Sequence, residues 1–288
     1  MDIAITDIGS NAVKYKVFSD SGELKEYVRE PLRLGTDVFN HGFLKDKTRK
    51  ELVNLLIKFK QSFDSKNISQ QHFIATSALR DANNKNEIIE DLADNDIYLN
   101  IISGNEEAEL LTKFSTKYRS YAVVDIGGGS LEIYVNDGIK SSYASFNLGA
   151  VRLLHINSTK IIDEKKRLQR WLENFQSVEI IYGLGGNLRC ILEIGNGEKK
   201  VASESYLMLL DKYKEMDNDT LVNNYLIPED RVDIVPLAGE LYKEIMEQLR
   251  ASYLKSSFWS ISNGLIEKVI KESKESVSYT HLTLPTKA

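Results

Sequence analysis

Two stretches of the chain share one pattern of hydrophobic and polar positions. Residues 3–18 and 121–135 each begin with an apolar run that leads into an acidic residue and a glycine turn, and each continues with alternating apolar and polar residues. The β-branched and aromatic residues at every second position favour strands over helices, so both stretches predict a β-hairpin. Their acidic residues, Asp7 and Asp125, are 118 positions apart, which indicates a duplicated unit and two related halves.

The remaining segments predict helices and strands in alternation, which is typical of an α/β fold. Apolar residues at helical spacing predict helices at 47–63, 86–94, 163–175, 205–216, 237–254 and 265–274. Alternating or short apolar runs predict strands at 24–34, 97–102 and 256–261, a strand followed by a turn and a helix at 72–82 and 178–189, and a loop at 217–219.

Composition narrows the class of protein. A chain of 288 residues with 42% hydrophobic and 27% charged residues is typical of a soluble globular protein and has room for two domains. The single cysteine, Cys190, excludes an internal disulfide and a cysteine zinc cluster. The net charge of −5 argues against broad nucleic-acid binding. With no apolar run of membrane-spanning length and no basic and apolar segment at the start, we expect a cytoplasmic protein without a membrane partner.

The turn after Asp125 is the strongest candidate for an anion site. Its glycines can adopt positive φ and let backbone amides approach a ligand, and successive amides form a nest for phosphate oxygens. A carboxylate beside a phosphate needs a cation between them, so Asp125 predicts a bound Mg²⁺. The alternative is a tight hairpin with an exposed Asp-Gly turn, because short glycine motifs match often by chance. The recurrence of the pattern at Asp7 favours a phosphate chain held between two facing turns.

Residues 103–109 offer a candidate general base. Gly104 ends a strand, and Glu106 and Glu107 open a helix, whose N-terminus favours negative charge. This preference explains both glutamates without catalysis. The alternative is that one of them projects into a cleft and activates water. Adjacent helical residues point about 100° apart, so at most one can do so.

Three further features are candidates for phosphate contacts. Gly185 and Gly186 belong to a third glycine-rich turn, between a strand and a helix, which suits phosphates or a nucleotide but equally suits close packing of the strand on the helix. Arg33, just ahead of a glycine, and Arg80, near a helix start, could reach a phosphate. For Arg33, an exposed arginine at the end of a strand is the commoner case. For Arg80, simple helix capping with a solvated arginine explains the sequence at least as well.

Five motifs in a fixed order give a specific resemblance to a known family. They are DIGSN at 7–11, ATSALRDA at 75–82, SGNEEAE at 103–109, DIGGGSLE at 125–132 and GLGG at 183–186. Together they resemble the exopolyphosphatase and guanosine pentaphosphate phosphatase family, within the actin-like phosphotransferase superfamily. The resemblance covers roughly residues 3–274. It implies two ribonuclease-H-like (actin-like ATPase) domains around an interdomain cleft, dependence on Mg²⁺, and hydrolytic release of a terminal phosphate from polyphosphate or of the 5′-phosphate from guanosine pentaphosphate.

The resemblance also implies roles for individual residues. Glu107 corresponds to the catalytic base of the family, and Glu132 is a second acidic group of the site. Asp125 and Asp7 would hold Mg²⁺. The phosphate-binding residues would be Gly9, Ser10, Asn11, Arg33, Arg80, Gly127, Gly128, Gly129, Ser130, Gly185 and Gly186.

The chain departs from the family in three places. Ala12 stands where the family often has a serine, and residues 263–268 replace an acidic-glycine stretch with arginine and glutamate. The chain also stops after the two core domains, so we expect short polyphosphate chains or a nucleotide as substrate. Two other functions stay open: an ATP-using kinase or ATPase of the same superfamily, and a non-catalytic protein that binds a guanosine alarmone and regulates a partner.

We expect domain I to comprise residues 1–118, completed by a C-terminal helix at 263–275, and domain II to comprise residues 119–262. Residues 276–288 lack acidic residues, which indicates an appended or disordered tail. Members of the family often pair, so a homodimer is compatible with the resemblance, although no stretch identifies its interface.

Overall fold

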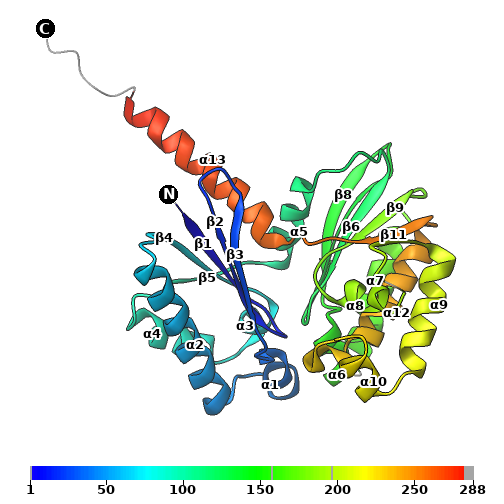
Figure 1. The fold of residues 1–288 in the computed structure, drawn as a ribbon, viewed down its shortest axis with the longest axis horizontal. Coiled ribbons are helices and arrows are strands. Elements are labelled where there is room, and N and C mark those ends of the chain that lie inside the picture. Colours follow the sequence, from blue (N-terminus) through cyan, green and yellow to red (C-terminus); the bar gives the residue numbers. More distant parts are fainter. Residues whose placement is uncertain (1, 157, 196, 282–288) are drawn as a thin grey trace, which may run out of the picture.

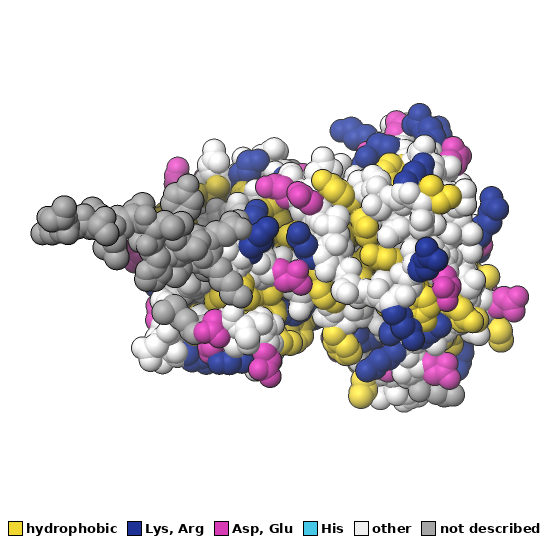
Figure 2. All heavy atoms as spheres, turned by 90° about the horizontal axis from the view of Figure 1, so that it is seen from above, with side chains coloured by type: hydrophobic (Ala, Val, Ile, Leu, Met, Phe, Trp, Pro, Cys, Tyr) yellow, Lys and Arg dark blue, Asp and Glu magenta, His cyan; other side chains and the backbone are white. Residues whose placement is uncertain are grey.

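Two β-sheets form the centres of two α/β domains, which lie side by side in the computed structural model (Figure 1). The structure describes residues 2–156, 158–195 and 197–281. The predicted α/β class with two domains is confirmed. Within the described residues, no helix combines the length and the apolar composition that crossing a membrane requires. Seen from above, basic and acidic side chains are interspersed over this face of the molecule (Figure 2).

The N-terminal sheet has the strand order β3-β2-β1-β4-β5. Its strands are β1 (Ile3–Ile8), β2 (Val13–Phe18), β3 (Leu24–Glu30), β4 (Gln70–Ala75) and β5 (Leu99–Ile101). Its helices are α1 (Leu34–His41), α2 (Asp46–Ser65), α3 (Ser77–Asp81), α4 (Lys85–Ala93), α5 (Gly104–Leu110) and the 3₁₀ helix η1 (Leu111–Lys113). β1 pairs antiparallel with β2 and parallel with β4, so a hairpin is extended by parallel strands.

The second sheet repeats this arrangement in the order β10-β11-β9-β6-β7-β8. Its strands are β6 (Tyr121–Ile126), β7 (Leu131–Asn136), β8 (Ser141–Phe146), β9 (Ile180–Gly183), β10 (Lys200–Ala202) and β11 (Tyr253–Ser256). Its helices are α6 (Ala150–His155), α7 (Thr159–Leu172), α8 (Asn187–Glu193), α9 (Ser203–Glu215), α10 (Asn218–Asn223), α11 (Glu229–Val232) and α12 (Val235–Gln248). β6 pairs antiparallel with β7 and parallel with β9, as β1 does with β2 and β4.

The duplication places the two aspartates at equivalent points. Asp7 and Asp125 each occupy the last position but one of the first strand of their sheet. Across the hairpin, Asp7 lies opposite Lys14, whereas Asp125 lies opposite Glu132. Both turns are closed by the same backbone hydrogen bond, from Gly9 to Ala12 in the first and from Gly127 to Ser130 in the second. The equivalent hairpins therefore present a cation in one domain and a carboxylate in the other.

Two elements near the C-terminus differ from the prediction. The helix expected at 237–254 ends at Gln248, and the following residues form β11, which pairs in parallel with β9. The strand expected at 256–261 is wrong beyond Ser256, which ends β11. Trp259 packs edge-on against Phe114, 5.6 Å between ring centroids, and helix α13 (Ile261–His281) begins two residues later. Tertiary contacts, not sheet pairing, account for the apolar residues of this segment.

Helix α13 packs on the N-terminal sheet. Ile266 is buried in a cluster with Ile3, Ile5 and Phe18, and Figure 1 shows the helix running from the junction of the domains along this sheet. The helix continues to His281, into the segment expected to be a tail, and residues 282–288 lie outside the described residues.

The prediction missed several short elements, among them α1, α6, β10, α10 and α11. The loop expected at 217–219 is the start of α10, because the side chain of Asp217 accepts a hydrogen bond of 2.7 Å from the amide of Thr220. Helix α11 matters most for the site, because Asp230 within it and Asp233 at its C-terminal end contact the N-terminal domain.

Candidate active site

The start of helix α5 decides between the two candidate glutamates. Ser103 and Glu106 form a capping box: the Glu106 amide donates to Ser103 Oγ at 3.2 Å, and the Ser103 amide donates to Glu106 Oε2 at 2.7 Å. Glu106 therefore fulfils the helix-start role. Glu107 points inward and is only 3% exposed, which is the position expected of a catalytic group.

Glu107 is held by an arginine. Arg80 Nη1 lies 2.8 Å from Glu107 Oε1 and also donates to the backbone oxygen of Ile102 at 2.7 Å. The predicted phosphate ligand Arg80 thus contacts the predicted base. The same nitrogen of Arg80 thus binds a backbone carbonyl and the carboxylate, which orients Glu107 by a charge-assisted hydrogen bond.

Glu132 lies close to Glu107 and is similarly buried, with 2% exposure. Ser145 Oγ donates to Glu132 Oε1 at 2.8 Å. Burial, and after it the charge of Asp125, raise the pKa of Glu132 to about 8. Burial and the charge of Glu132 raise the pKa of Glu107 well above its usual value. The structure therefore brings together Glu107, Glu132 and Asp125 as carboxyl groups that oppose one another's ionisation.

Asp7 and Asp125 could together hold a divalent cation whose other ligands are water and substrate oxygens. Burial raises the pKa of Asp125, and Asp7 adds a second acidic charge, while Lys14 Nζ lies 3.5 Å from Asp7 Oδ2. In the part of the chain that the structure describes, no group of three or more acidic, histidine or cysteine side chains is arranged to hold a metal. Mg²⁺ commonly takes one or two carboxylates and fills its other positions with water and phosphate oxygens, and Asp7 with Asp125 matches that mode.

The two glycine turns meet at the domain interface. A Cβ on Gly128 would lie 2.9 Å from the Cβ of Ser10, and one on Gly129 would lie 2.6 Å from Ser10 Oγ and would collide with Ser77. Glycine is therefore required for this close approach. Ser10 Oγ is buried and has no hydrogen-bond partner among the described residues, so it is a polar group that a ligand could satisfy.

Two predicted phosphate ligands are engaged by helix α11 of the other domain. Arg33 Nε donates to Asn11 Oδ1 at 2.8 Å, and the guanidinium of Arg33 makes a bidentate pair with Asp233 at 2.6 and 2.8 Å. Asn11 Nδ2 donates to Asp230 Oδ2 at 2.8 Å, and Arg29 also pairs with Asp230. The structure brings Asn11 and Arg33 together, and each of them contacts a carboxylate of the second domain.

Arg152 is a site residue that the sequence analysis did not identify. It is 9% exposed, and its guanidinium donates to the backbone oxygen of Gly129 at 2.6 Å and to Ser77 Oγ at 2.9 Å, and pairs with Asp81 at 2.5 Å. It thereby fixes the glycine turn of one domain against α3 of the other. The arginine follows the strand after the second hairpin, but nothing local in the sequence marks the contact.

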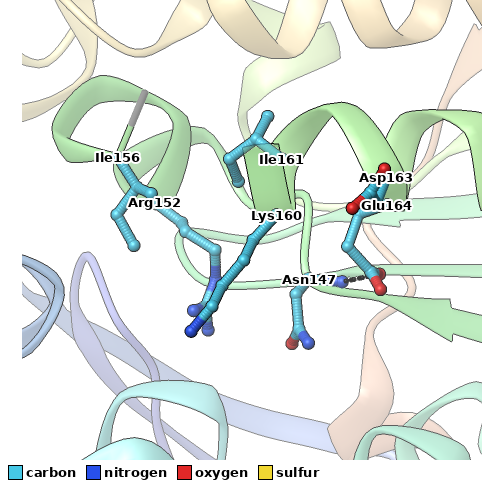
Figure 3. A pocket seen from close by; sticks show the side chains of 7 residues that line it. All are labelled: Asn147, Arg152, Ile156, Lys160, Ile161, Asp163 and Glu164. Atoms are coloured by element: carbon cyan, nitrogen blue, oxygen red, sulfur yellow. Dashed lines mark hydrogen bonds between the residues drawn. The ribbon is translucent and has the colours of Figure 1, made fainter. Parts of the chain in front are cut away.

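Figure 3 shows Arg152 at the edge of a cavity of about 290 Å³, with Lys160 extending beside it. This cavity is lined by residues of the second domain alone and contains none of the predicted catalytic carboxylates. Its two basic side chains are balanced by Asp163 and Glu164. We therefore place the chemistry at the interface of the domains.

A larger cavity, of about 560 Å³, lies between the domains next to Asp7 and Lys14. Its other basic residues are Lys16, Arg29, Arg189 and Arg231. The predicted turn residues Gly185 and Gly186 line it as well. A Cβ on Gly186 would lie 2.5 Å from the guanidinium carbon of Arg231, so this glycine makes room for an arginine.

Comparisons with known proteins point to phosphatases. Residues 24–273 match the model of the Ppx/GppA phosphatase family. A bifunctional 3-dehydroquinate synthase/phosphatase of Fusobacterium nucleatum is 32% identical over 169 residues, which are 52% of this chain and 25% of that protein. A guanosine-5'-triphosphate,3'-diphosphate pyrophosphatase of Vibrio parahaemolyticus is 23% identical over 94% of this chain and 60% of that protein. The chain thus spans between a quarter and three fifths of the length of these relatives.

A solved structure confirms the fold. The crystal structure of an exopolyphosphatase from Cytophaga hutchinsonii matches 94% of this chain and 98% of its own with a TM-score of 0.82, at 18% sequence identity. The predicted actin-like ATPase fold, with two ribonuclease-H-like domains around a cleft, is therefore confirmed.

Proposed function

Since this chain belongs to the Ppx/GppA phosphatase family, we propose that it is a Mg²⁺-dependent phosphohydrolase that acts on a phosphoanhydride. Its substrate is inorganic polyphosphate, from which it releases the terminal phosphate, or guanosine pentaphosphate, from which it releases the 5′-phosphate. The names of the relatives support the reaction class.

The observation that carries the proposal is the placement of Glu107. Glu107 is buried and oriented by Arg80, whereas its neighbour Glu106 caps the helix. In the proposed reaction, water attacks the terminal phosphorus and gives a proton to the Glu107 carboxylate, while the phosphoanhydride oxygen leaves with its electron pair. A raised pKa makes Glu107 a stronger base once it is ionised.

Other residues of the chain position the substrate. The amides of the two glycine turns would bind phosphate oxygens where negative charge develops. Ser10 Oγ, which lacks a partner among the described side chains, would donate to the same phosphate. Asp7 and Asp125 would hold Mg²⁺, which neutralises charge on the phosphates when it is bound. The metal and the localisation in the cytoplasm stay predictions.

The test compares two neighbouring glutamates. Glu107→Gln should lower kcat for phosphate release by about 10²- to 10⁴-fold, because the proton acceptor is lost. Glu106→Gln is the matched control and should keep most activity, since glutamine can also complete a capping box. Purified protein with Mg²⁺ is assayed on short polyphosphate, long polyphosphate, guanosine pentaphosphate and ATP. A folded Glu107→Gln protein with undiminished release would refute the mechanism.

A second candidate function is a nucleotide-binding regulator without turnover. One observation favours it. Asn11 and Arg33, which are expected to bind phosphate in the reaction, are already engaged by the carboxylates of Asp230 and Asp233. The same assay separates the candidates. Nucleotide binding without release of phosphate from any of the four substrates selects the regulator, and phosphate transfer from ATP to an acceptor selects a kinase.

A further inference from the structure

Three successive backbone carbonyls of the second glycine turn face helix α6. The oxygen of Gly127 accepts a hydrogen bond of 2.9 Å from the amide of Ala150. The oxygen of Gly128 accepts one of 2.9 Å from the amide of Arg152. The next oxygen, that of Gly129, accepts one of 2.6 Å from Arg152 Nε. The first turn of α6 thus holds all three carbonyls from one side.

The amides of the same peptide groups point away from α6. A trans peptide group is planar, and its N–H and C=O groups point in opposite directions. The peptide bonds of this turn are trans, so the three held carbonyls fix the amides of Gly128, Gly129 and Ser130. None of these amides donates to a backbone oxygen in the part of the chain that the structure describes. Successive amides of this kind form a nest for phosphate oxygens.

The third carbonyl is the one whose position depends on a side chain. The first two are held by backbone amides of α6, whereas the oxygen of Gly129 is held by the guanidinium of Arg152. The peptide group between Gly129 and Ser130 also lies directly against Gly149, where a Cβ would collide with it. Arg152 therefore controls the direction of the Ser130 amide.

The guanidinium of Arg152 is itself held in one orientation. Its Nη2 donates to Ser77 Oγ at 2.9 Å and pairs with Asp81 Oδ2 at 2.5 Å. Its central carbon lies 4.2 Å from the centre of the Phe39 ring. A planar guanidinium that is both paired and stacked has little freedom to turn, so Nε stays directed at Gly129.

We propose that Arg152 is a positioning residue for phosphate release: through the carbonyl of Gly129, its guanidinium directs the Ser130 amide at the phosphate that is cleaved. The inference rests on the proposed function for the identity of that phosphate. Arg152 lies on the α6 side of the turn and acts without touching the substrate. An amide directed at the place where negative charge develops stabilises the transition state more than the bound substrate. Its misplacement should therefore lower kcat.

The alternative is that Arg152 only ties the two domains together. Its partners Ser77 and Asp81 belong to the N-terminal domain, so its loss would also loosen the interface. Asp81→Asn separates the two roles, because asparagine removes the charge of the partner, keeps an oxygen that can accept a hydrogen bond, and leaves the contact with Gly129. Equal losses of kcat in Asp81→Asn and Arg152→Ala would select the tie between domains and overturn the positioning role.

Chemical rescue tests the positioning role directly. Arg152→Ala removes the guanidinium at the edge of the cavity in Figure 3, which opens to solvent because Lys160 and Asp163 in its lining are exposed. Free guanidinium, added at millimolar concentration, can enter there and restore the hydrogen bond to Gly129. The values of kcat and KM for phosphate release from short polyphosphate are measured with and without it.

Arg152→Ala should lower kcat by roughly 10- to 100-fold and raise KM by less than about tenfold, because the misplaced amide serves chiefly the transition state. Guanidinium should recover most of the lost kcat. It should not raise kcat in Arg170→Ala, which removes an exposed arginine of α7. Asp81→Asn should keep kcat within about threefold of the wild type.

Arg152→Lys provides a second variant if Arg152→Ala does not fold. Lysine keeps the positive charge but lacks the planar fork of donors, so it cannot hold Gly129 and Asp81 together. Its kcat should fall by at least about tenfold. A wild-type kcat in this variant would overturn the positioning role.

The outcomes separate the positioning role from the reaction. Phosphate release with an unchanged kcat in Arg152→Ala, or with a loss that guanidinium does not restore, overturns the role and leaves the proposed function intact. If the wild type releases phosphate from no substrate, the proposed function fails, and calorimetric titration with tetrapolyphosphate decides the role. A Kd that Arg152→Ala raises and guanidinium restores supports the orientation of the turn, and an unchanged Kd overturns it.

Discussion

At the scale of single residues, burial and neighbouring charge determine the chemistry. Glu107 and Glu106 are adjacent in the chain, yet one is buried beside other carboxyl groups and the other caps a helix. The same environment that raises the pKa of Glu107 makes its ionised form unfavourable in the folded protein. A carboxyl group that is buried beside other carboxyl groups in this way lowers stability.

We therefore expect Glu107→Gln to raise the thermal unfolding midpoint at neutral pH in the absence of metal. Glutamine keeps an oxygen that can accept from Arg80 and removes the buried charge. Thermal unfolding followed by circular dichroism measures the change. Glu106→Gln, at an exposed position, should not raise the midpoint. A lower midpoint for Glu107→Gln would show that the ion pair with Arg80 outweighs the cost of burial.

The lowered pKa of Lys16 predicts how the free energy of unfolding changes at alkaline pH. Burial, and then the charge of Lys14, lower its pKa from 10.5 to about 8 in the folded protein, while Asp7 and Asp125 oppose this shift. Between pH 8 and 10.5 the unfolded chain thus binds more protons at Lys16 than the folded chain does. In this pH range, Lys16 should make the free energy of unfolding increase with pH. Lys16→Met should remove this contribution to the slope. Urea unfolding at several pH values measures both slopes, and equal slopes would contradict the prediction.

At the scale of elements, helix caps fix where the site residues point. The capping box of Ser103 and Glu106 starts α5 and sets the direction of Glu107 one position later. Helix α7 also follows a serine, Ser158, but the side chain of that serine makes no capping hydrogen bond. The two serines form a natural comparison.

Ser103→Ala should lower the free energy of unfolding by about 1 kcal/mol, because the Glu106 amide loses its acceptor. It should also lower kcat, because the first turn of α5 holds Glu107. Ser158→Ala should change the free energy of unfolding by less than about 0.5 kcal/mol. Urea unfolding and the phosphate-release assay measure the two effects. Equal losses from both variants would refute the role of the cap.

At the scale of the whole molecule, arginines join the two domains around the site. Arg152 of α6 reaches Ser77 and Asp81 of the N-terminal domain, and Arg33 reaches Asp233 of the second. These contacts surround the glycine turns, so they determine how closely the turns approach. Closing of domains around a substrate depends on such contacts.

Arg152→Met should lower the free energy of unfolding by about 2 kcal/mol or more, because buried hydrogen bonds to charged or polar groups are lost together. It should also raise KM, since the turn that contains Gly129 loses its support. Arg170→Met, at an exposed position, is the control. Unfolding by urea, followed through tryptophan fluorescence, measures the effect. A variant as stable as the control would show that the domains hold together without Arg152.

Several features of this protein are determined by its sequence alone. The duplicated hairpins, the glycine turns and the class of fold follow from periodicity and from residues that are close in the chain, because strand alternation and turn geometry are local properties. The five motifs identified the family for the same reason, since each is a short segment with its own backbone requirement.

Only the tertiary structure decided which partners these residues have. Helix α11 is too short to show a period, and its contacts with Asn11 and Arg33 cross about 200 positions of the chain. The shared cavity of Lys16, Arg189 and Arg231 is found only when residues from three separate elements are placed in space. Burial, pairing and the absence of a counter-charge depend on distances between remote segments, which a local pattern does not contain.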